Sequence, residues 1–315
     1  MNNKLSRASM RLIALAAVFA AAQTPVRAEL IVGLTSQNTL ISFDSTTPGT
    51  ISAPVNLSGI VAGDTLIGID RRPSTGLLNG TLYSLGVNFG SGLGRLYTID
   101  PLTGIATVGS TLSADPADIT APFPFSTVQG TQFGFDFNPV PDRLRVVSNT
   151  GQNLRINVSN GFVQLDVALA YLAGDANFGA SPCITAVAYS NNFGGASSTV
   201  LRGVDTCLSP DVLTTISNPN AGTLQTQATL PFDSNGALTG YDISGLTGTP
   251  YFSITAGTSG SSSFYMGTSL VGTIGGGVSV MDIAAPVGNA VPEPAGVLLS
   301  GAGLLAMAVW RRRRQ

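Results

Sequence analysis

The amino-acid sequence predicts an all-β protein and, within that class, a β-propeller. Throughout residues 29–284, short apolar runs and alternations rich in Thr, Val, Ile, Phe and Tyr are broken by Gly, Pro, Asn and Asp. This is the pattern of strands joined by turns. Similar lines of sequence also recur at intervals of roughly 50 residues, as in proteins built from repeated units. No stretch with a convincing helical period lies between them.

Five similar lines open the repeated units. They begin at Leu30, Leu66, Gln132, Thr185 and Leu238, with spacings of 36, 66, 53 and 53 residues. Each opening strand leads through a turn to a second and a third strand. Small sheets of this kind bury their two faces only against neighbouring sheets, so five units predict a ring of five blades. The 66-residue spacing leaves room for a sixth blade, and a β-sandwich or an irregular β-solenoid is the alternative fold.

Residues 1–28 have the organisation of a secretory signal peptide. Lys4, Arg7 and Arg11 precede an apolar run from Leu12 to Ala22, and Val26-Arg27-Ala28 supplies small residues at the usual cleavage positions. The apolar run is too short for a membrane-spanning helix. We therefore expect export across the cytoplasmic membrane, with cleavage after Ala28 and a propeller domain over residues 29–284.

The C-terminal segment has several parts in a fixed order. A linker is expected over residues 285–291, and residues 292–315 contain a motif (Pro292, Glu293, Pro294), sixteen mostly apolar residues and a basic block (Arg311, Arg312, Arg313, Arg314). A helix of sixteen residues is about 24 Å long, shorter than the roughly 30 Å hydrocarbon core. Because arginines stay on the cytoplasmic side, this short transmembrane helix would hold the body outside.

This segment resembles the PEP-CTERM sorting signal, in which a Pro-Glu-Pro motif, a short helix and a basic cluster follow one another. The resemblance implies recognition by an exosortase, a membrane cysteine protease, and removal of the tail. It also implies a Gram-negative-type bacterium that makes extracellular polysaccharide. The protein would then be anchored transiently in the membrane and passed to the cell surface or the extracellular matrix. A plain C-terminal anchor is the alternative.

The composition limits the chemistry of the body. The chain has no histidine, which excludes Ser-His-Asp and Cys-His catalysis, a histidine base and histidine-ligated metals. Between residues 29 and 290, sixteen acidic residues accompany only seven arginines, for a net charge of −9. Because no basic stripe exists to neutralise phosphates, a nucleic-acid partner is not expected.

Three aspartates occupy equivalent places in the opening strands, namely Asp70, Asp136 and Asp242, where Tyr189 and Thr35 stand in the other two. The first strand of each propeller blade lines the central channel, so the three carboxylates could converge there. With Asn138 and carbonyl oxygens as further hard ligands, they could hold Ca²⁺. The alternative is that each aspartate accepts hydrogen bonds from nearby turn amides. A carboxylate pair such as Asp70 and Asp136 could also serve glycoside hydrolysis, but any aspartate pair would qualify equally.

Arg143, Arg145 and Arg155 flank one predicted hairpin turn. Arg143 and Arg145 share a strand face. A three-residue loop at 149–151 would place Arg155 opposite Arg145, whereas a four-residue loop would place it on the other face. Such a cluster would suit a carboxylate ligand, including that of an acidic polysaccharide. The alternative is internal pairing, with Asp136, Asp142 or Asp166 as partners.

The two cysteines, Cys183 and Cys207, lie at the start of one predicted strand and just after the end of the next. Antiparallel neighbours bring these ends together, and an even cysteine count in an exported protein favours a disulfide. Closing this loop would stabilise the fold by roughly 3 kcal/mol. A catalytic cysteine is not expected in a chain without histidine.

The body also resembles the domain-of-unknown-function family 4394, found in exported bacterial proteins. The residues that carry this resemblance are Leu66–Pro73, Leu96–Gly104, Phe133–Pro139, Asp142–Ser148, Gly151–Arg155, Ala188–Asn192 and Gly240–Ile243. The family has no assigned activity, so the resemblance implies an architecture and export from the cytoplasm, but no reaction. We expect a non-catalytic binding or structural module without a cofactor other than calcium. An aspartate-dependent, calcium-assisted propeller hydrolase or lyase is the alternative.

Overall fold

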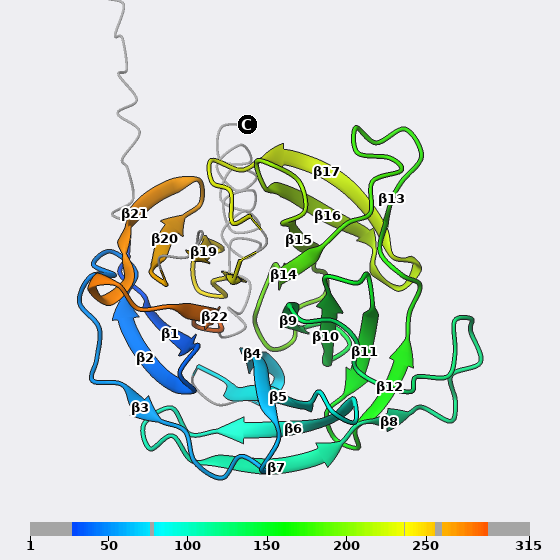
Figure 1. Ribbon diagram of the computed structural model, residues 1–315, viewed down its shortest axis with the longest axis horizontal. Coiled ribbons are helices and arrows are strands. Elements are labelled where there is room, and N and C mark those ends of the chain that lie inside the picture. Colours follow the sequence, from blue (N-terminus) through cyan, green and yellow to red (C-terminus); the bar gives the residue numbers. More distant parts are fainter. Residues whose placement is uncertain (1–26, 76–78, 236, 256–259, 289–315) are drawn as a thin grey trace, which may run out of the picture.

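A computed structural model describes residues 27–75, 79–235, 237–255 and 260–288. These residues form five mainly antiparallel sheets, which are arranged as the blades of a ring (Figure 1). The described ranges contain no α-helix and only three short 3₁₀ turns, η1 (Pro73–Thr75), η2 (Pro219–Ala221) and η3 (Ile274–Gly276). The predicted all-β propeller is therefore confirmed, while the predicted C-terminal helix and most of the signal peptide lie outside the described residues.

The strands of each blade follow one another from the axis outward. Blade 1 contains β22 (Val280–Ala284), β1 (Leu30–Thr35), β2 (Thr39–Asp44) and β3 (Val55–Asn56). Blade 2 contains β4 (Thr65–Arg72), β5 (Thr81–Asn88), β6 (Leu93–Ile99) and β7 (Ala106–Thr111). Blade 3 contains β9 (Phe133–Asn138), β10 (Arg143–Ser148), β11 (Asn153–Asn157) and β12 (Phe162–Leu165). Blade 4 contains β14 (Ile184–Tyr189), β15 (Leu201–Asp205), β16 (Val212–Asn218) and β17 (Thr223–Thr229). Blade 5 contains β18 (Thr239–Ile243), β19 (Pro250–Thr255), β20 (Ser262–Met266) and β21 (Ser269–Thr273).

Two short strands protect outer edges by parallel pairing. β8 (Ser113–Ala114) leaves blade 2 and pairs with β12 of blade 3, and β13 (Ala170–Tyr171) leaves blade 3 and pairs with β17 of blade 4. Each connecting segment thus adds to the blade that follows it. Because an unpaired edge strand can pair with another chain, this arrangement also covers edges that would otherwise be open.

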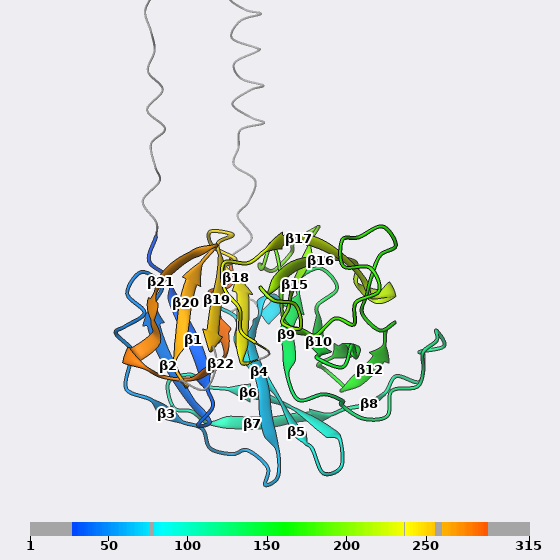
Figure 2. The ribbon, with the colours of Figure 1, turned by 45° about the horizontal axis from the view of Figure 1, so that its top comes forward.

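The number of blades is five. The innermost strands contact one another in the closed order β22, β4, β9, β14, β18 and back to β22, and Figure 2 shows several of them standing around a common axis. The long spacing between the second and third repeats contains β8 and a loop that runs up to β9, with cis peptide bonds before Pro122 and Pro124. The described residues of this span do not form a sixth sheet.

The ring is closed by strands from opposite ends of the chain. β22 pairs antiparallel with β1, with Gly33 opposite Ile283. The predicted first opening strand, which begins at Leu30, is therefore the second strand of its blade. Glu29, immediately before it, is 3 % exposed, and its carboxylate accepts hydrogen bonds from Ser244 and Tyr251 of blade 5. Blade 1 is thus fixed at both chain ends.

The hydrophobic core consists of layers between blades. One cluster joins blades 2 and 3 through side chains such as Leu85, Phe135 and Leu144, and another joins blades 4 and 5 through Ala188 and Tyr241. All six residues of β14 are buried. This is the packing expected when small sheets shield one another in sequence around a ring.

The predicted disulfide is present. Cys183 and Cys207 are bonded, with their Cα atoms 5.3 Å apart. The N–H groups of both cysteines donate to Asp205 Oδ1, each at 3.0 Å. The disulfide therefore fixes the segments that flank β14 and β15 at one end of blade 4.

Residues 285–288 belong to the folded body. They are buried, and they continue from β22 to the segments that follow β14 and β18. The N–H of Gly288 donates to the carbonyl of Asn192 (2.8 Å), and the N–H of Gly245 donates to that of Pro286 (2.9 Å). The first four residues of the predicted linker are therefore held by hydrogen bonds. Among the described residues, no helix is long and apolar enough to cross a membrane.

Candidate functional site

The three aspartates that the repeats align meet at the axis of the ring. Asp70, Asp136 and Asp242 are at most 1 % exposed. One carboxylate oxygen from each lies within 4.8 Å of the other two. They come from β4, β9 and β18, which belong to blades 2, 3 and 5. The predicted convergence is therefore present in the structure.

A fourth aspartate, Asp282, belongs to the same inner ring, and the sequence prediction misses it. It lies on β22, the innermost strand of blade 1, and is 6 % exposed. The repeats predict Thr35 for this place, because they make the strand at Leu30 the opening strand of its blade. Thr35 Oγ1 instead contacts Thr39 Oγ1 at 2.7 Å, across the β1–β2 turn. The line Val280-Met281-Asp282-Ile283 carries a weak signal, since an apolar residue directly precedes the aspartate, as in the other three inner strands that carry one, but Val280 stands where they have glycine.

Each of these aspartates connects its strand to the next part of the ring. The four bonds run from the N–H of Ile69 to Asp282 (2.9 Å), of Phe137 to Asp70 (2.7 Å), of Tyr189 to Asp136 (3.0 Å) and of Ala285 to Asp242 (2.6 Å). The carboxylates thus accept from adjacent strands rather than only from their own turns. Between β14 and β18, where Tyr189 replaces an aspartate, the contact is made by buried apolar side chains.

Glycines two residues before the aspartates permit this close approach. A Cβ on Gly68 would lie 2.6 Å from Phe135 Cβ and 2.8 Å from Asp282 Oδ2. A Cβ on Gly134 would lie 2.8 Å from the Val187 nitrogen, and one on Gly240 would lie 2.9 Å from Asp282 Cα. Real side chains do not fit at these distances. The repeated Gly-x-Asp pattern is therefore the local sequence that lets neighbouring inner strands pack backbone to backbone.

The clustered carboxylates are strongly perturbed. Burial raises the pKa of Asp70 and of Asp136 well above the usual range, and nearby carboxylates raise both further. Burial raises the pKa of Asp242 to about 7, although hydrogen bonds from Ala285 and Ile243 act in the opposite direction. Burial also raises the pKa of Asp282 well above its usual value. The site thus favours either protons or a cation over bare negative charge.

Arg71, which is 8 % exposed, is a basic neighbour of the cluster. Its guanidinium interacts electrostatically with Asp70 and Asp242, and Nη1 donates to the carbonyl of Asn79 at 3.0 Å. Among the buried atoms that lack a hydrogen-bond partner in the described residues are one of Arg71, Nε, and one of the cluster, Asp136 Oδ2. Buried polar atoms in folded proteins are normally paired, so Asp136 Oδ2 marks a place where a partner fits.

Asn138, the fourth predicted ligand, is engaged elsewhere. Its side-chain oxygen accepts the N–H of Val140 at 3.0 Å in the turn after β9. Asn138 also lines a cleft between blades 3 and 4, with a volume of about 520 Å³. The structure therefore gives Asn138 a turn-forming role and a surface position.

The predicted arginine cluster is divided by pairing. Arg145 and Arg155 are opposite one another, as a three-residue loop requires, and both bind Asp166, at 2.6 Å and 3.0 Å. Arg145 is buried and also donates to Asn153 and Asn220. Arg143 donates instead to the carbonyls of Pro141 and Asp142. The internal pairing expected as the alternative is therefore observed, and Arg145 is committed to it.

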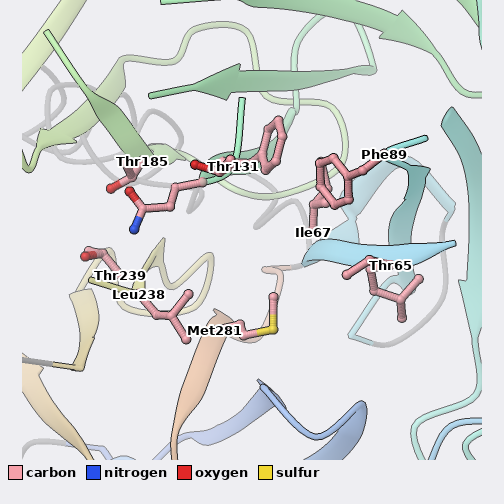
Figure 3. A pocket seen from close by; sticks show the side chains of 11 residues that line it. Thr65, Ile67, Phe89, Thr131, Thr185, Leu238, Thr239 and Met281 are labelled. Atoms are coloured by element: carbon pink, nitrogen blue, oxygen red, sulfur yellow. The ribbon is translucent and has the colours of Figure 1, made fainter. Parts of the chain in front are cut away.

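A small pocket lies at the end of the ring where the innermost strands begin (Figure 3). Its lining comes from all five inner strands and their approaches, for example Ile67, Thr185, Leu238 and Met281, and from Phe89 in the β5–β6 turn. Its volume is about 70 Å³. Ordinary small-molecule sites start at roughly 300 Å³, so this opening does not admit a sugar ring.

Comparison with known proteins identifies two family matches. The model described as "Domain of unknown function (DUF4394)" matches residues 39–284, and the one described as "PEP-CTERM protein-sorting motif" matches residues 290–314. A search of curated proteins finds no match.

Several solved structures are similar to the chain at low sequence identity. A nidogen/laminin complex is 8 % identical with a TM-score of 0.43, covering 82 % of this chain and 98 % of that chain. Myxococcus xanthus glutaminyl cyclase is 14 % identical with a TM-score of 0.39, covering 72 % and 89 %. A protein from Lactobacillus plantarum is 13 % identical with a TM-score of 0.36, covering 82 % and 71 %.

The first family match spans all five innermost strands and the aspartates that they carry. The chain therefore belongs to the DUF4394 family of domains of unknown function, and it carries a PEP-CTERM protein-sorting motif near its C-terminus.

Proposed function

We propose that this protein is a non-catalytic binding or structural module of the cell surface or extracellular matrix. In this proposal the signal peptide is cleaved after Ala28, the C-terminal segment holds the chain in the membrane, and an exosortase-type protease removes that segment. The observation that carries the proposal is the sorting motif at residues 290–314, directly after a closed propeller. The described body ends at residue 288, so removal of the tail leaves every blade intact.

The arrangement of the carboxylates supports a module without catalysis. All four axial aspartates are buried and accept main-chain hydrogen bonds that connect strands. The pocket at the nearby mouth is too small for a sugar. Glycoside hydrolysis needs two carboxyl groups on either side of a bound glycosidic bond, and this arrangement does not offer such access.

The proposed ligand is extracellular polysaccharide, bound on the outer surface. The cleft between blades 3 and 4 has a volume of about 520 Å³, which is in the range of small-molecule sites. Its lining combines hydroxyl and amide groups, from Asn138, Ser198, Thr199, Thr215 and Ser217, with apolar side chains such as Val140, Val200 and Ile216. Groups of this kind hydrogen-bond sugar hydroxyls without requiring charge.

Replacement of Pro292, Glu293 and Pro294 by alanine tests the sorting step. We expect the variant to keep its tail and stay in the membrane fraction, while the wild-type chain loses mass and appears at the surface or in the medium. Mass spectrometry of the fractionated protein measures both. Equal processing of the two chains would refute exosortase sorting.

Glycan-array binding of the processed protein tests the ligand. We expect the wild-type protein to bind extracellular polysaccharide and Thr215→Ala, which removes a hydroxyl group from the cleft, to bind more weakly. A blank array, with acidic polymers included, would refute polysaccharide binding.

The alternative is an aspartate-dependent, calcium-assisted hydrolase or lyase. The observation that favours it is the raised pKa of Asp242, about 7, which suits a general acid. Activity on acidic and neutral polysaccharides that disappears in Asp242→Asn and not in Asp211→Asn would establish this function in place of the first.

A further inference from the structure

The axial carboxylates form a cage of oxygen atoms with the dimensions that a small ion requires. One oxygen from each of Asp70, Asp136 and Asp242 lies within 4.8 Å of the other two. Calcium binds oxygen at about 2.3–2.6 Å, so two oxygens on opposite sides of one ion are separated by about 4.6–5.2 Å. The three oxygens are therefore close enough together to share one ion.

We propose that Asp70, Asp136 and Asp242 hold one hard divalent cation, Ca²⁺, on the axis of the propeller. The ion would tie blades 2, 3 and 5 together from within. This site is independent of where the chain is sorted and of whether it binds polysaccharide.

A second observation points to a ligand at this place. Asp136 Oδ1 accepts the N–H of Tyr189, but Asp136 Oδ2 is buried without a hydrogen-bond partner among the described residues. A buried, unpaired carboxylate oxygen is costly. The other members use both oxygens in main-chain hydrogen bonds, which fix their orientation and leave further lone pairs for a metal. The cage is thus rigid, and one of its oxygens lacks a partner.

The charge of the cluster also favours a cation. Asp70, Asp136, Asp242 and Asp282 lie in one buried region, and Arg71 is the basic group that interacts electrostatically with Asp70 and Asp242. Buried carboxylates persist as ions only when a counter-charge accompanies them. One divalent ion together with Arg71 supplies most of that counter-charge.

The donor chemistry selects calcium among divalent ions. The chain has no histidine, and both cysteines form the disulfide, so nitrogen and thiolate ligands for zinc or copper are absent from the described body. Carboxylate oxygens suit Ca²⁺ and Mg²⁺. Calcium accepts irregular sets of six to eight oxygens, whereas magnesium demands a near-ideal octahedron at about 2.0–2.1 Å. Three clustered carboxylates held on separate blades fit an irregular set better than a regular octahedron.

The test begins with the exported, full-length protein purified in detergent without chelator. Elemental analysis should give one calcium per chain in the wild type and none in Asp136→Asn. This variant retains an oxygen for the N–H of Tyr189 and removes only the charge and the metal ligand. After treatment with chelator, calorimetric titration with CaCl₂ alone should show one site and a rise in thermal midpoint. The protein should bind Mg²⁺, titrated as MgCl₂, at least tenfold more weakly than Ca²⁺.

Asp211→Asn is the matched control. Asp211 is also fully buried with one oxygen, Oδ1, that lacks a partner, but it lies outside the axial cluster. It should keep the wild-type response to calcium, whereas Asp136→Asn should bind at least 100-fold more weakly. In the absence of calcium, Asp136→Asn should melt above the chelated wild type, because the amide needs neither a counter-ion nor a proton in order to be buried.

Three results would overturn the proposal. The first is that the purified wild type contains no calcium and binds none up to about 10 mM CaCl₂. This concentration lies above the range of weak extracellular calcium sites. Protons, and not a metal ion, would then neutralise the cluster. The second is a calcium response that Asp136→Asn leaves unchanged, which would place the ion elsewhere. The third is tighter binding of Mg²⁺ than of Ca²⁺. If Asp136→Asn does not fold, Asp70→Asn and Asp242→Asn provide the same comparison.

Discussion

At the scale of single residues, the inner ring depends on pairs of positions two apart in the chain. In β4, β9 and β18 a glycine lets the neighbouring backbone approach, and the aspartate two residues later accepts a hydrogen bond from the adjoining part of the ring. Since residues two apart point to the same side of a strand, both act on one face. The glycine and the aspartate therefore act together: the glycine allows neighbouring strands to approach, and the aspartate binds the backbone of the neighbouring segment.

Gly68→Ala tests the close approach. The added Cβ would lie 2.6 Å from Phe135 Cβ and 2.8 Å from Asp282 Oδ2, so inner strands must separate. We expect the free energy of unfolding to fall by about 1–3 kcal/mol, measured by urea denaturation. Gly272→Ala, in β21, is the control because the nearest atom would be 3.6 Å away. Equal losses in the two variants would show that the loss of glycine itself, and not the contact, decides the effect.

Asp211 provides a pH dependence separate from the axial cluster. It accepts the N–H of Ser234 at 3.0 Å, and burial raises its pKa to about 6. A carboxyl group whose folded pKa is raised holds its proton more tightly in the folded state. Its contribution to stability is therefore present at low pH and is lost as the pH rises from about 4 to about 6.

Asp211→Asn should remove this dependence. Relative to the variant, the wild type should lose about 2 kcal/mol of unfolding free energy between pH 4 and pH 7. Urea denaturation of both chains at several pH values measures the difference. A constant difference across this range would contradict the raised pKa.

At the scale of the element, the hairpin of β10 and β11 shows how far sequence reasoning extends. The loop length decides the register, and hence the opposition of Arg145 and Arg155, since a hairpin loop sets which residues face each other. The sequence does not decide the partner among three aspartates, because Asp166 follows β12 and its distance from Arg145 depends on the whole blade. The local sequence thus determines which strand face Arg145 and Arg155 share, whereas only the complete fold determines which aspartate pairs with them.

Asp166→Asn tests the importance of this buried pair. Arg145 is 2 % exposed and would lose its carboxylate partner, which typically costs about 3–5 kcal/mol. Arg155→Ala is the control, because its side chain contacts the same carboxylate but is 28 % exposed; its removal should cost less than about 1 kcal/mol. Chemical denaturation of both variants measures the losses. Similar losses would mean that burial does not distinguish the two ion pairs.

At the scale of the whole molecule, the sequence predicts the ring but not its closure. Four of the five innermost strands can be located from their repeated lines, since each is followed by the rest of its own blade. The fifth, β22, is separated from its blade by almost the whole body. No local pattern says that a C-terminal strand pairs with β1. The sequence prediction misses Asp282 and the buried segment 285–288 for the same reason: their hydrogen-bond partners lie in other blades, at Ile69, Asn192, Asp242 and Gly245.

Truncation tests whether β22 closes the ring. A chain that ends at residue 288 keeps β22, the pairing of Gly33 with Ile283 and the bond from Ala285 to Asp242. It should show the same cooperative thermal transition as the full-length protein.

A chain that ends at residue 279 loses β22, so the inner edge of β1 and the apolar side chains of Ile31 and Ile41 lose the contacts that bury them. An open ring leaves its terminal blades exposed on one face, so this shorter chain should lack a cooperative transition and be cleaved rapidly by added protease. Circular dichroism and timed proteolysis of both truncated chains measure these differences. If the chain that ends at residue 279 unfolds cooperatively and resists protease, four complete blades and an incomplete one are sufficient for a stable fold.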